Sequence, residues 1–529
     1  MPSPTATTEA VTKRLCSLVL KSALASKTSL NRRWSLNDLP DDLILLILEF
    51  VEVMDIIRLR QTSKRMYRLS KLRWVWSTAI RRLMMERRLT IPALDLDINA
   101  FSANHFETRA VHAVKYHENW HSERPMPKRK IKVQLKPKPG ETYSTVRKVF
   151  FLPGKKGEIL ITVTQRSIAC WEVPLGGSEG FLLAEVVAPG DIQDAVVNED
   201  PSHDTQIVLS YAGSDPESTD RILIALHLDE FHGKLVTLHK SVVPFVVGCS
   251  LYALHGRWLA CGKWPSALDI EHRCQQVMGL CQLDTEKVLT VKFVDGCLLI
   301  ITSKHAYITT IHEDEKLGTY SVKCAFLAEF SYSVRDAAVW VQKPLRQTNR
   351  KVNIPEMVSI VLRCDDGGFE TLKQLDCLRN PHGTVDGHVG AFSPLFSPAC
   401  TRTIMISPSS CNFVVGTHGK GVFFETKTIT TSSRTSYTAR CLGGFELRRS
   451  DEEFDMVYQA NIVGPKHSYR LSYQPPQFVE CKREVYSRRC DMGEIMYRRF
   501  SLASVALEDA VGRIAIGDRN GMLEILDYA

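Results

Sequence analysis

The segment 43–51, LILLILEFV, most constrains what this 529-residue chain can fold into, because Glu49 is its only polar residue. Pro40 suits the first position of a helix. Asp41 and Asp42 would then lie in the first helical turn, where the helix dipole favours carboxylates. The segment therefore predicts a short helix that is apolar on every side.

A helix that is apolar all round needs cover on both of its sides. The helical segments that follow, 55–61 and 63–70, can cover one side only. About forty residues rarely make a complete core by themselves. We therefore expect the uncovered side to be a docking surface for another protein.

Residues 39–76 resemble an F-box in spacing as well as in composition. The matching positions are Leu39, Pro40, Leu43, Ile47, Asp55, Ile56, Leu69 and Trp76. One position departs from the pattern: Met66 stands where the family often has an aromatic residue, and Met fills irregular apolar gaps. The alternative is a three-helix segment buried against its own domain.

The resemblance implies binding to the adaptor subunit of the cullin–RING ubiquitin ligases known as SCF complexes, and through it to the cullin. The residues predicted to contact the adaptor are Leu39, Pro40, Leu43, Ile47, Leu48, Val51, Ile56 and Trp76. We predict no catalytic residue, cofactor or metal.

The positive charge lies at the front of the chain. Residues 1–138 carry 26 Lys and Arg against 13 Asp and Glu, while the remainder carries 41 against 46. A basic front can meet nucleic acid or an acidic protein. Because no nucleic-acid-binding signature accompanies it, we expect an acidic protein partner and no nucleic acid.

Cysteine usage and hydropathy place the protein in the cytoplasm, the nucleus or both. The 15 cysteines form no C-x-x-C pair, which is typical of reduced thiols inside cells. No run of eighteen apolar residues occurs, so no membrane span is expected. Residues 127–130, PKRK, are either a nuclear-import patch or a solvated linker.

Four regions follow from composition. Residues 1–34 are predicted to be a disordered basic tail, with a mitochondrial presequence as the alternative. Residues 35–80 form the F-box, and residues 81–142 a helical and Pro/Lys-rich basic linker, whose connector part is 122–141. From 143 to 529 we expect a WD-repeat-like β-propeller.

The propeller prediction rests on short apolar runs with period two, separated by turn residues. An all-β array of that length fits about seven blades of four strands. Two hairpins resemble WD-repeat blades, with turns at Gln165-Arg166 and Asn520-Gly521. A strand near Val146 is expected to pair with C-terminal strands and close the ring. An F-box followed by such a propeller resembles SCF substrate receptors.

Three further motifs are weaker candidates for functional sites. His117-Glu118-x-x-His121 matches the zinc-protease pattern, but the alternative is a helix that packs Tyr116 and Trp120. Residues 416–421, GTHGKG, contain a fragment of a phosphate loop, but strands flank them and favour a hairpin turn. The candidates for reading a phosphorylated motif are Arg448, Arg449, Arg488 and Arg489.

The sequence therefore predicts an α + β multidomain protein: a three-helix F-box, a helical linker and an all-β propeller of about seven blades. The predicted function is a non-catalytic substrate receptor of an SCF ligase that binds a protein target. The alternatives are an interaction scaffold outside a ubiquitin ligase and, more remotely, a zinc hydrolase.

Overall fold

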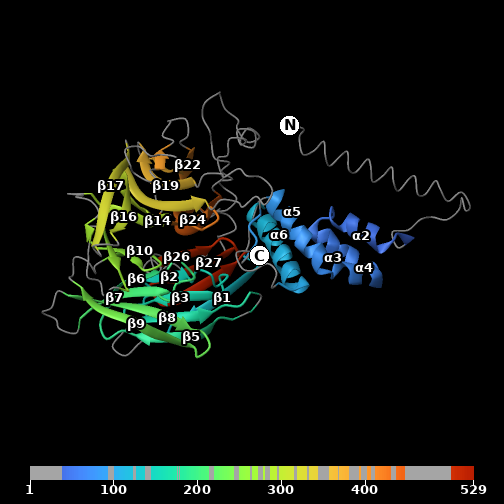
Figure 1. Ribbon diagram of the computed structural model, residues 1–529, viewed down its shortest axis with the longest axis horizontal. Helices are drawn as coiled ribbons and strands as arrows, with labels where there is room; N and C mark the ends of the chain where they lie inside the picture. The colour runs from blue at the N-terminus through green and yellow to red at the C-terminus, as the bar shows by residue number, and fades with distance from the viewer. Residues whose placement is uncertain are drawn as a thin grey trace, which may run out of the picture. The chain divides into compact units, whose positions relative to one another are not determined.

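A computed structural model gives the protein as two compact units (Figure 1). Unit 1 comprises residues up to Leu83 together with Phe101–Ala110, and unit 2 comprises Met84–Ala100 and Val111–Ala529. The residues that the structure describes are 38–87, 89–92, 101–122, 127–137, 144–175, 177, 179–213, 220–243, 250–262, 265–271, 278–279, 286–294, 297–314, 319–330, 333–342, 357–366, 369–379, 392–394, 402–406, 411–430, 436–446 and 502–529. The predicted tail and the four candidate arginines between 448 and 489 lie outside them.

Unit 1 is helical, as expected for the F-box segment. Its helices are α2 (Asp41–Leu48), α3 (Val53–Arg60), α4 (Lys64–Ser70), α5 (Arg73–Met85, up to Leu83) and the first part of α6 (Ala103–Trp120). Ser63 begins α4 as its N-cap, because its hydroxyl accepts a hydrogen bond from the Met66 N–H at 3.1 Å.

The core of unit 1 forms between these short helices. The buried apolar side chains of α2 to α5 are Ile44, Leu48, Val53, Ile56, Met66, Leu69, Val75, Trp76, Ala79, Ile80 and Leu83. The indole Nε1 of Trp76 donates to the Ser70 carbonyl at 2.7 Å, so its polar edge is satisfied inside the core. Met66 is 2% exposed, which confirms that methionine packs at this position.

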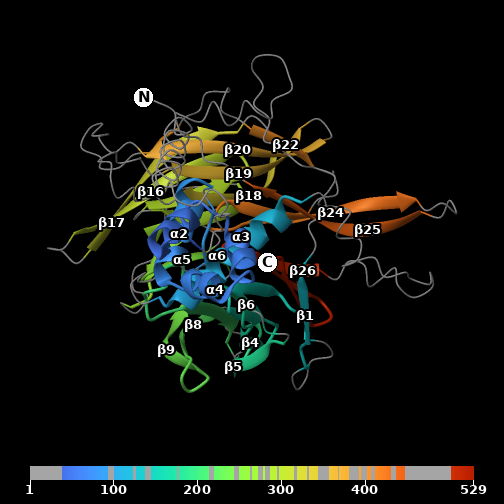
Figure 2. The same ribbon diagram turned by 90° about the vertical axis from the view of Figure 1, so that its right-hand side faces the viewer.

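Unit 2 consists mainly of small antiparallel sheets, seven within the described residues (Figure 2). Four of them, in the order of their paired strands, are β2 (Lys148–Phe151), β3 (Ile159–Val163), β4 (Ser167–Glu172) and β5 (Phe181–Val187); β6 (Ile192–Val197), β7 (Ile207–Ala212), β8 (Arg221–Asp229) and β9 (Lys234–Val243); β10 (Leu251–His255), β11 (Trp258–Cys261), β12 (Ser266–Asp269) and β13 (Met278–Gly279); and β14 (Val288–Val294), β15 (Cys297–Thr302), β16 (His305–Asp314) and β17 (Thr319–Glu329).

The other three sheets contain the remaining strands. They are β18 (Ser333–Gln342), β19 (Met357–Asp366), β20 (Phe369–Arg379) and β21 (Phe392–Pro394), with β22 (Arg402–Ile406) also on β20; β23 (Cys411–Val415), β24 (Lys420–Thr430) and β25 (Ser436–Glu446); and β1 (Arg129–Gln134), β28 (Met522–Asp527), β27 (Arg513–Asp518) and β26 (Leu502–Glu508).

Each sheet neighbours the next through one of its end strands. The neighbouring pairs are β6 and β10, β10 and β14, β14 and β18, β18 and β23, β23 and β26, and β26 and β2. Lys148 of β2 reaches β6, where its Nζ pairs with the Asp194 carboxylate and donates to the Ala195 carbonyl at 3.2 Å. Every sheet thus has neighbours on two sides.

The period-two prediction located many of these strands. The apolar runs at 146–152, 158–164 and 167–173, for example, coincide with β2, β3 and β4. Gln165 and Arg166 join β3 to β4, and Asn520 and Gly521 join β27 to β28, as the two WD-like hairpins require.

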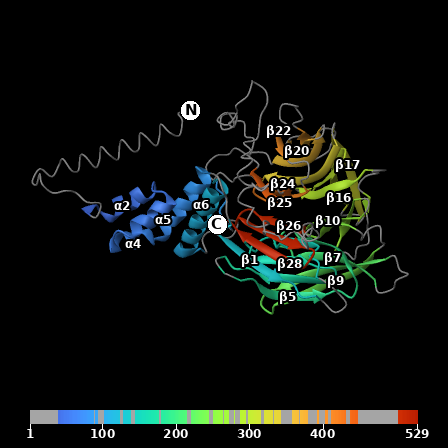
Figure 3. The same cartoon turned by 180° about the vertical axis from the view of Figure 1, so that it is seen from behind.

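The prediction of a connector over 122–141 is wrong for residues 129–134, which form β1. Strand β1 pairs with β28 in register from Arg129–Asp527 to Gln134–Met522 (Figure 3). Burial alternates along β1, because Ile131 is buried while Lys130 and Lys132 are exposed. The lysines at the exposed positions gave this strand the composition of a linker. The expected strand pairing near Val146 is replaced by separate hydrogen bonds to the C-terminal segment. Val146 N–H donates to the Asp518 carbonyl at 3.0 Å, the Thr145 hydroxyl to the Arg519 carbonyl at 2.9 Å, and Val149 N–H to the Ser504 hydroxyl at 3.0 Å.

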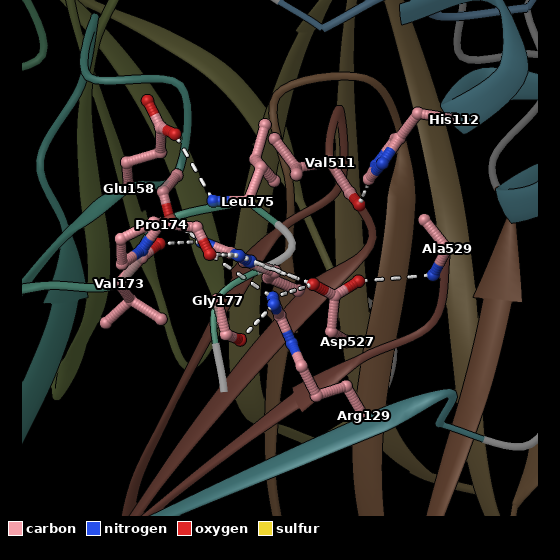
Figure 4. Close-up of polar contacts among 12 residues, drawn as sticks. His112, Arg129, Glu158, Val173, Pro174, Leu175, Gly177, Val511, Asp527 and Ala529 are labelled. Carbon is pink, nitrogen blue, oxygen red and sulfur yellow. Dashed lines mark hydrogen bonds and ion pairs between the residues drawn. The ribbon is translucent and has the colours of Figure 1, made fainter. Parts of the chain in front are cut away.

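Two arginines and one carboxylate hold this sheet together (Figure 4). Arg129 of β1 and Arg513 of β27 both bind the carboxylate of Asp527 at the end of β28. Arg513 is fully buried and also donates to the carbonyls of Gly157 and Pro174, both at 2.8 Å. The pair therefore links β27 and β28 to the loops that flank β3 and β4.

The segment 416–421 is a hairpin turn, as the flanking strands predicted. Two of its backbone N–H groups, those of His418 and Lys420, donate hydrogen bonds to the buried carboxylate of Asp509, at 2.7 Å and 3.2 Å. A side chain at Gly416 would collide with this carboxylate, because a Cβ there would lie 2.3 Å from the Asp509 Cγ. These amides bind a carboxylate of the chain itself.

Replacing Asp527 by Asn should destabilise unit 2. The change leaves the fully buried Arg513 without its counter-charge, and breaking a buried pair costs about 3–5 kcal/mol. Thermal unfolding of the full chain, followed by circular dichroism, measures the loss. Arg166→Ala is the control, because the exposed Arg166–Asp191 pair in unit 2 contributes less than about 1 kcal/mol. Equal losses for the two variants would contradict the role given to Asp527.

Glu508 should make unit 2 less stable as the pH rises. Burial and the neighbouring Asp509 carboxylate raise the pKa of Glu508 from 4.5 to about 7. The folded state therefore holds a proton that the unfolded chain releases near pH 4.5, so the stability present below that pH is lost by about pH 7. Between pH 5 and 8, Glu508→Gln should lose less stability than the wild-type chain, measured by unfolding midpoints. Identical pH profiles would refute the assignment.

Candidate functional site

Helix α2 has one covered face and one open face. Ile44 and Leu48, four residues apart, are 1% and 3% exposed and belong to the core. Leu43 and Ile47 have the same spacing, lie about 100° around the helix from that pair, and are partly exposed. The structure thus places the surplus apolar side chains of this helix where a partner can reach them.

Arginines from later helices fix the backbone at both ends of α2. At its start, Arg65 of α4 pairs with Asp41 and donates to the Leu39 carbonyl at 2.6 Å. Beyond its end, Arg82 of α5 donates to the carbonyls of Glu49 and Val51, each at 2.6 Å. The last carbonyls of a helix lack intrahelical donors, so Arg82 satisfies groups that would otherwise need water.

We name the open surface the α2 face. It contains partly exposed and exposed apolar residues before, within and after the helix: Leu39, Pro40, Leu43, Ile47, Phe50 and Val51. Phe50 is 51% exposed and was not among the predicted contact residues. The helical spacing offered a signal for it, because Phe50 follows Leu43 by seven residues and Ile47 by three.

Three of the predicted contact residues are not on this surface. Leu48, Ile56 and Trp76 are 3%, 0% and 0% exposed, so they pack inside the protein. The prediction that they contact an adaptor directly is corrected by this burial. A family pattern marks apolar positions without separating those that build the core from those that remain open.

A second charge network, around Glu107, joins the helices of unit 1. Glu107 of α6 accepts hydrogen bonds from Arg60 at 2.6 Å and from Lys71 at 3.0 Å, and the Arg60 guanidinium lies 5.6 Å from the Trp76 ring centroid. Burial by itself raises the pKa of Glu107, but the bonds from Arg60 and Lys71 outweigh it, so that the pKa is lowered. The carboxylate therefore remains charged and ties α3, α4 and α6 together.

Exposed cations accompany the open apolar residues of unit 1. Arg58, Lys64 and Arg68 are exposed, and Arg58 pairs at 2.6 Å with the partly exposed Asp55. This mixture of apolar and cationic side chains can bind an apolar surface that has acidic residues around it.

The zinc-protease-like motif lies at the end of α6, in unit 2. Tyr116 and Trp120 are buried against strands of the C-terminal sheet, as the packing interpretation predicted, and the His117 and His121 rings are 4.2 Å apart. His121 Nδ1 also contacts the His117 carbonyl at 2.9 Å. Within the described ranges, no three His, Cys, Asp or Glu side chains gather as a metal site would require. Nor does any described helix combine the length and hydropathy of a membrane span.

Comparison with known families assigns the helical segment. The F-box domain model matches residues 36–78, which include the α2 face and the core of α2 to α4. F-box proteins are in general non-catalytic adaptors of ubiquitin ligase complexes, and F-box domains bind the adaptor subunit within SCF complexes. No curated protein matches the chain.

The stability losses caused by substitutions in α2 and α3 should distinguish core positions from positions on the α2 face. Ile56→Ala should destabilise the protein by about 2–5 kcal/mol, because the side chain is fully buried. Ile47→Ala, a comparable truncation at a partly exposed position, should cost less than about 1.5 kcal/mol. Chemical unfolding of the full chain compares them, and a larger loss for Ile47→Ala would contradict the placement of the two residues.

Proposed function

We propose that the chain is the substrate-recognition subunit of an SCF-type cullin–RING ubiquitin ligase. The observation that carries the proposal is the α2 face inside the F-box match, whose apolar side chains stay open while Ile44 and Leu48 fill the core. Arg65 and Arg82 hold its backbone, so the surface is in place before a partner arrives. Preorganisation of this kind lowers the entropic cost of binding.

For unit 2 we infer a seven-bladed, WD-repeat-like propeller. Support comes from the seven small antiparallel sheets of the described residues, each with a neighbour on two sides. Further support comes from the pairing of β1 with β28, because a strand from early in the chain then completes a sheet of C-terminal strands. Such pairing joins distant segments and protects an edge strand.

In this function the chain transfers nothing itself. The F-box would bind the adaptor and, through it, the cullin, while the propeller would bind a protein target. Ubiquitin transfer would then be accelerated by proximity, because the target is held near a ubiquitin-charged enzyme elsewhere in the complex. We propose the cytoplasm, the nucleus or both as the site of action.

The α2 face can be tested by binding to a purified SCF adaptor subunit. Leu43→Asp combined with Ile47→Asp should weaken binding at least about 100-fold, because two apolar contacts are replaced by charges that would be desolvated. Leu39→Ala combined with Pro40→Ala should also weaken it. Calorimetry or surface plasmon resonance with the full chain measures both.

Met85→Asp is the control, because Met85 is 57% exposed on α5 and lies outside the α2 face. It should bind the adaptor like the wild-type chain. Undiminished binding by the Leu43/Ile47 variant would refute the proposed docking site. Co-purification of adaptor without cullin would instead favour a scaffold that acts outside a ubiquitin ligase.

A further inference from the structure

Exposed apolar side chains also concentrate on two outer strands of unit 2, far in sequence from the F-box. Strand β5 exposes three of them, β9 exposes three, and the turn before β9 exposes the phenyl ring of Phe231, which is 92% exposed. We call this surface the β5–β9 patch: Phe181, Leu182, Val187, Phe231, Val236, Leu238 and Val242.

The two strands lie side by side although they belong to different sheets (Figures 1 and 3). Strand β5 is the outer strand of the sheet that begins with β2, and β9 is the outer strand of the sheet that begins with β6. The turn into β9 touches β5, because a Cβ on Gly233 would lie 3.0 Å from the Leu183 carbonyl oxygen. The apolar side chains therefore belong to one continuous surface.

Strand β9 is a long edge strand with exposed apolar side chains. It is ten residues long, and within the described part of the chain it pairs with β8 alone. Residues 236–240 are all exposed, so both faces of its central part meet solvent. Long exposed edges with apolar side chains favour pairing with another chain.

The charges on the patch are divided between its two strands. Glu172 and Glu185 are exposed on β4 and β5, whereas Lys234 and Lys240 are exposed on β9. Asp229 and Glu230, the acids next to β9, pair with His232 at 2.7 Å and with Lys155. The β5 side of the patch is thus acidic and the β9 side basic.

From this division we propose that the β5–β9 patch binds the same patch on a second copy of the chain. A two-fold axis between the strands places the acidic β5 side of each copy against the basic β9 side of the other. Such an interface is self-complementary and closes as a dimer. The two strands and their turn supply about twenty residues a side, the size of a standard interface.

The mixed charge favours a second copy over other occupants. Nucleic acid and anionic lipid select surfaces of one positive sign, and Glu172 and Glu185 would repel both. The patch lies in unit 2 and shares no residue with the α2 face of unit 1.

Sedimentation velocity of the full chain tests the proposal. The wild-type protein should form a dimer at micromolar concentrations, and Leu238→Asp or Val242→Asp should shift it to monomer by at least about tenfold in the dissociation constant. Both positions are exposed, so unfolding midpoints should not change. Phe50→Asp is the control, because Phe50 is similarly exposed but lies on the α2 face, and it should leave the dimer intact.

Charge reversal gives a readout that damage to the fold cannot mimic. Glu185→Lys and Lys240→Glu should each weaken the dimer, and the double variant should regain it, because the two signs remain opposite across the interface. A wild-type chain that stays monomeric up to about 100 µM would overturn the proposal. So would a dimer that persists in the Leu238 and Val242 variants, or a patch that binds only a different protein.

Discussion

The carboxylate of Asp527 is the charge on which the C-terminal sheet depends. Arg129 and Arg513 both bind it, although they come from strands 384 residues apart in numbering, and Arg513 is fully buried. Two cations around one anion are stable here because carbonyl groups of the loops around β3 and β4 accept the remaining guanidinium protons. This arrangement links β1, β27 and β28 to one another and to the loops of the neighbouring sheet.

The F-box unit uses the same chemistry for a different purpose. Arg65 and Arg82 bind backbone carbonyls at the two ends of α2, while Arg60 binds the partly buried Glu107 carboxylate. Guanidinium groups suit this role because they donate several hydrogen bonds in fixed directions. The apolar side chains of α2 are therefore divided by a rigid frame into a core set and an open set.

The sequence predicted the secondary structure of a segment better than it predicted whether each side chain is buried or exposed. Period two located strands such as β3 and β4, since their buried residues are apolar and their turns are short. Strand β1 was missed because lysines and prolines around Ile131 gave the composition of a solvated linker. Leu48, Ile56 and Trp76 were misplaced because an apolar motif residue can serve the core or a partner, and tertiary packing decides which. Phe50 was missed because it lies just beyond the helix that defines the motif.

Hydrogen–deuterium exchange of the full chain, with and without a purified SCF adaptor subunit, shows whether the α2 face is the surface that binds the adaptor. The exchange rates of backbone amides report which segments become protected on binding. We expect new protection over residues 39–51 and unchanged exchange in the strands of unit 2. Protection of the β-strands, with residues 39–51 unaffected, would contradict this expectation.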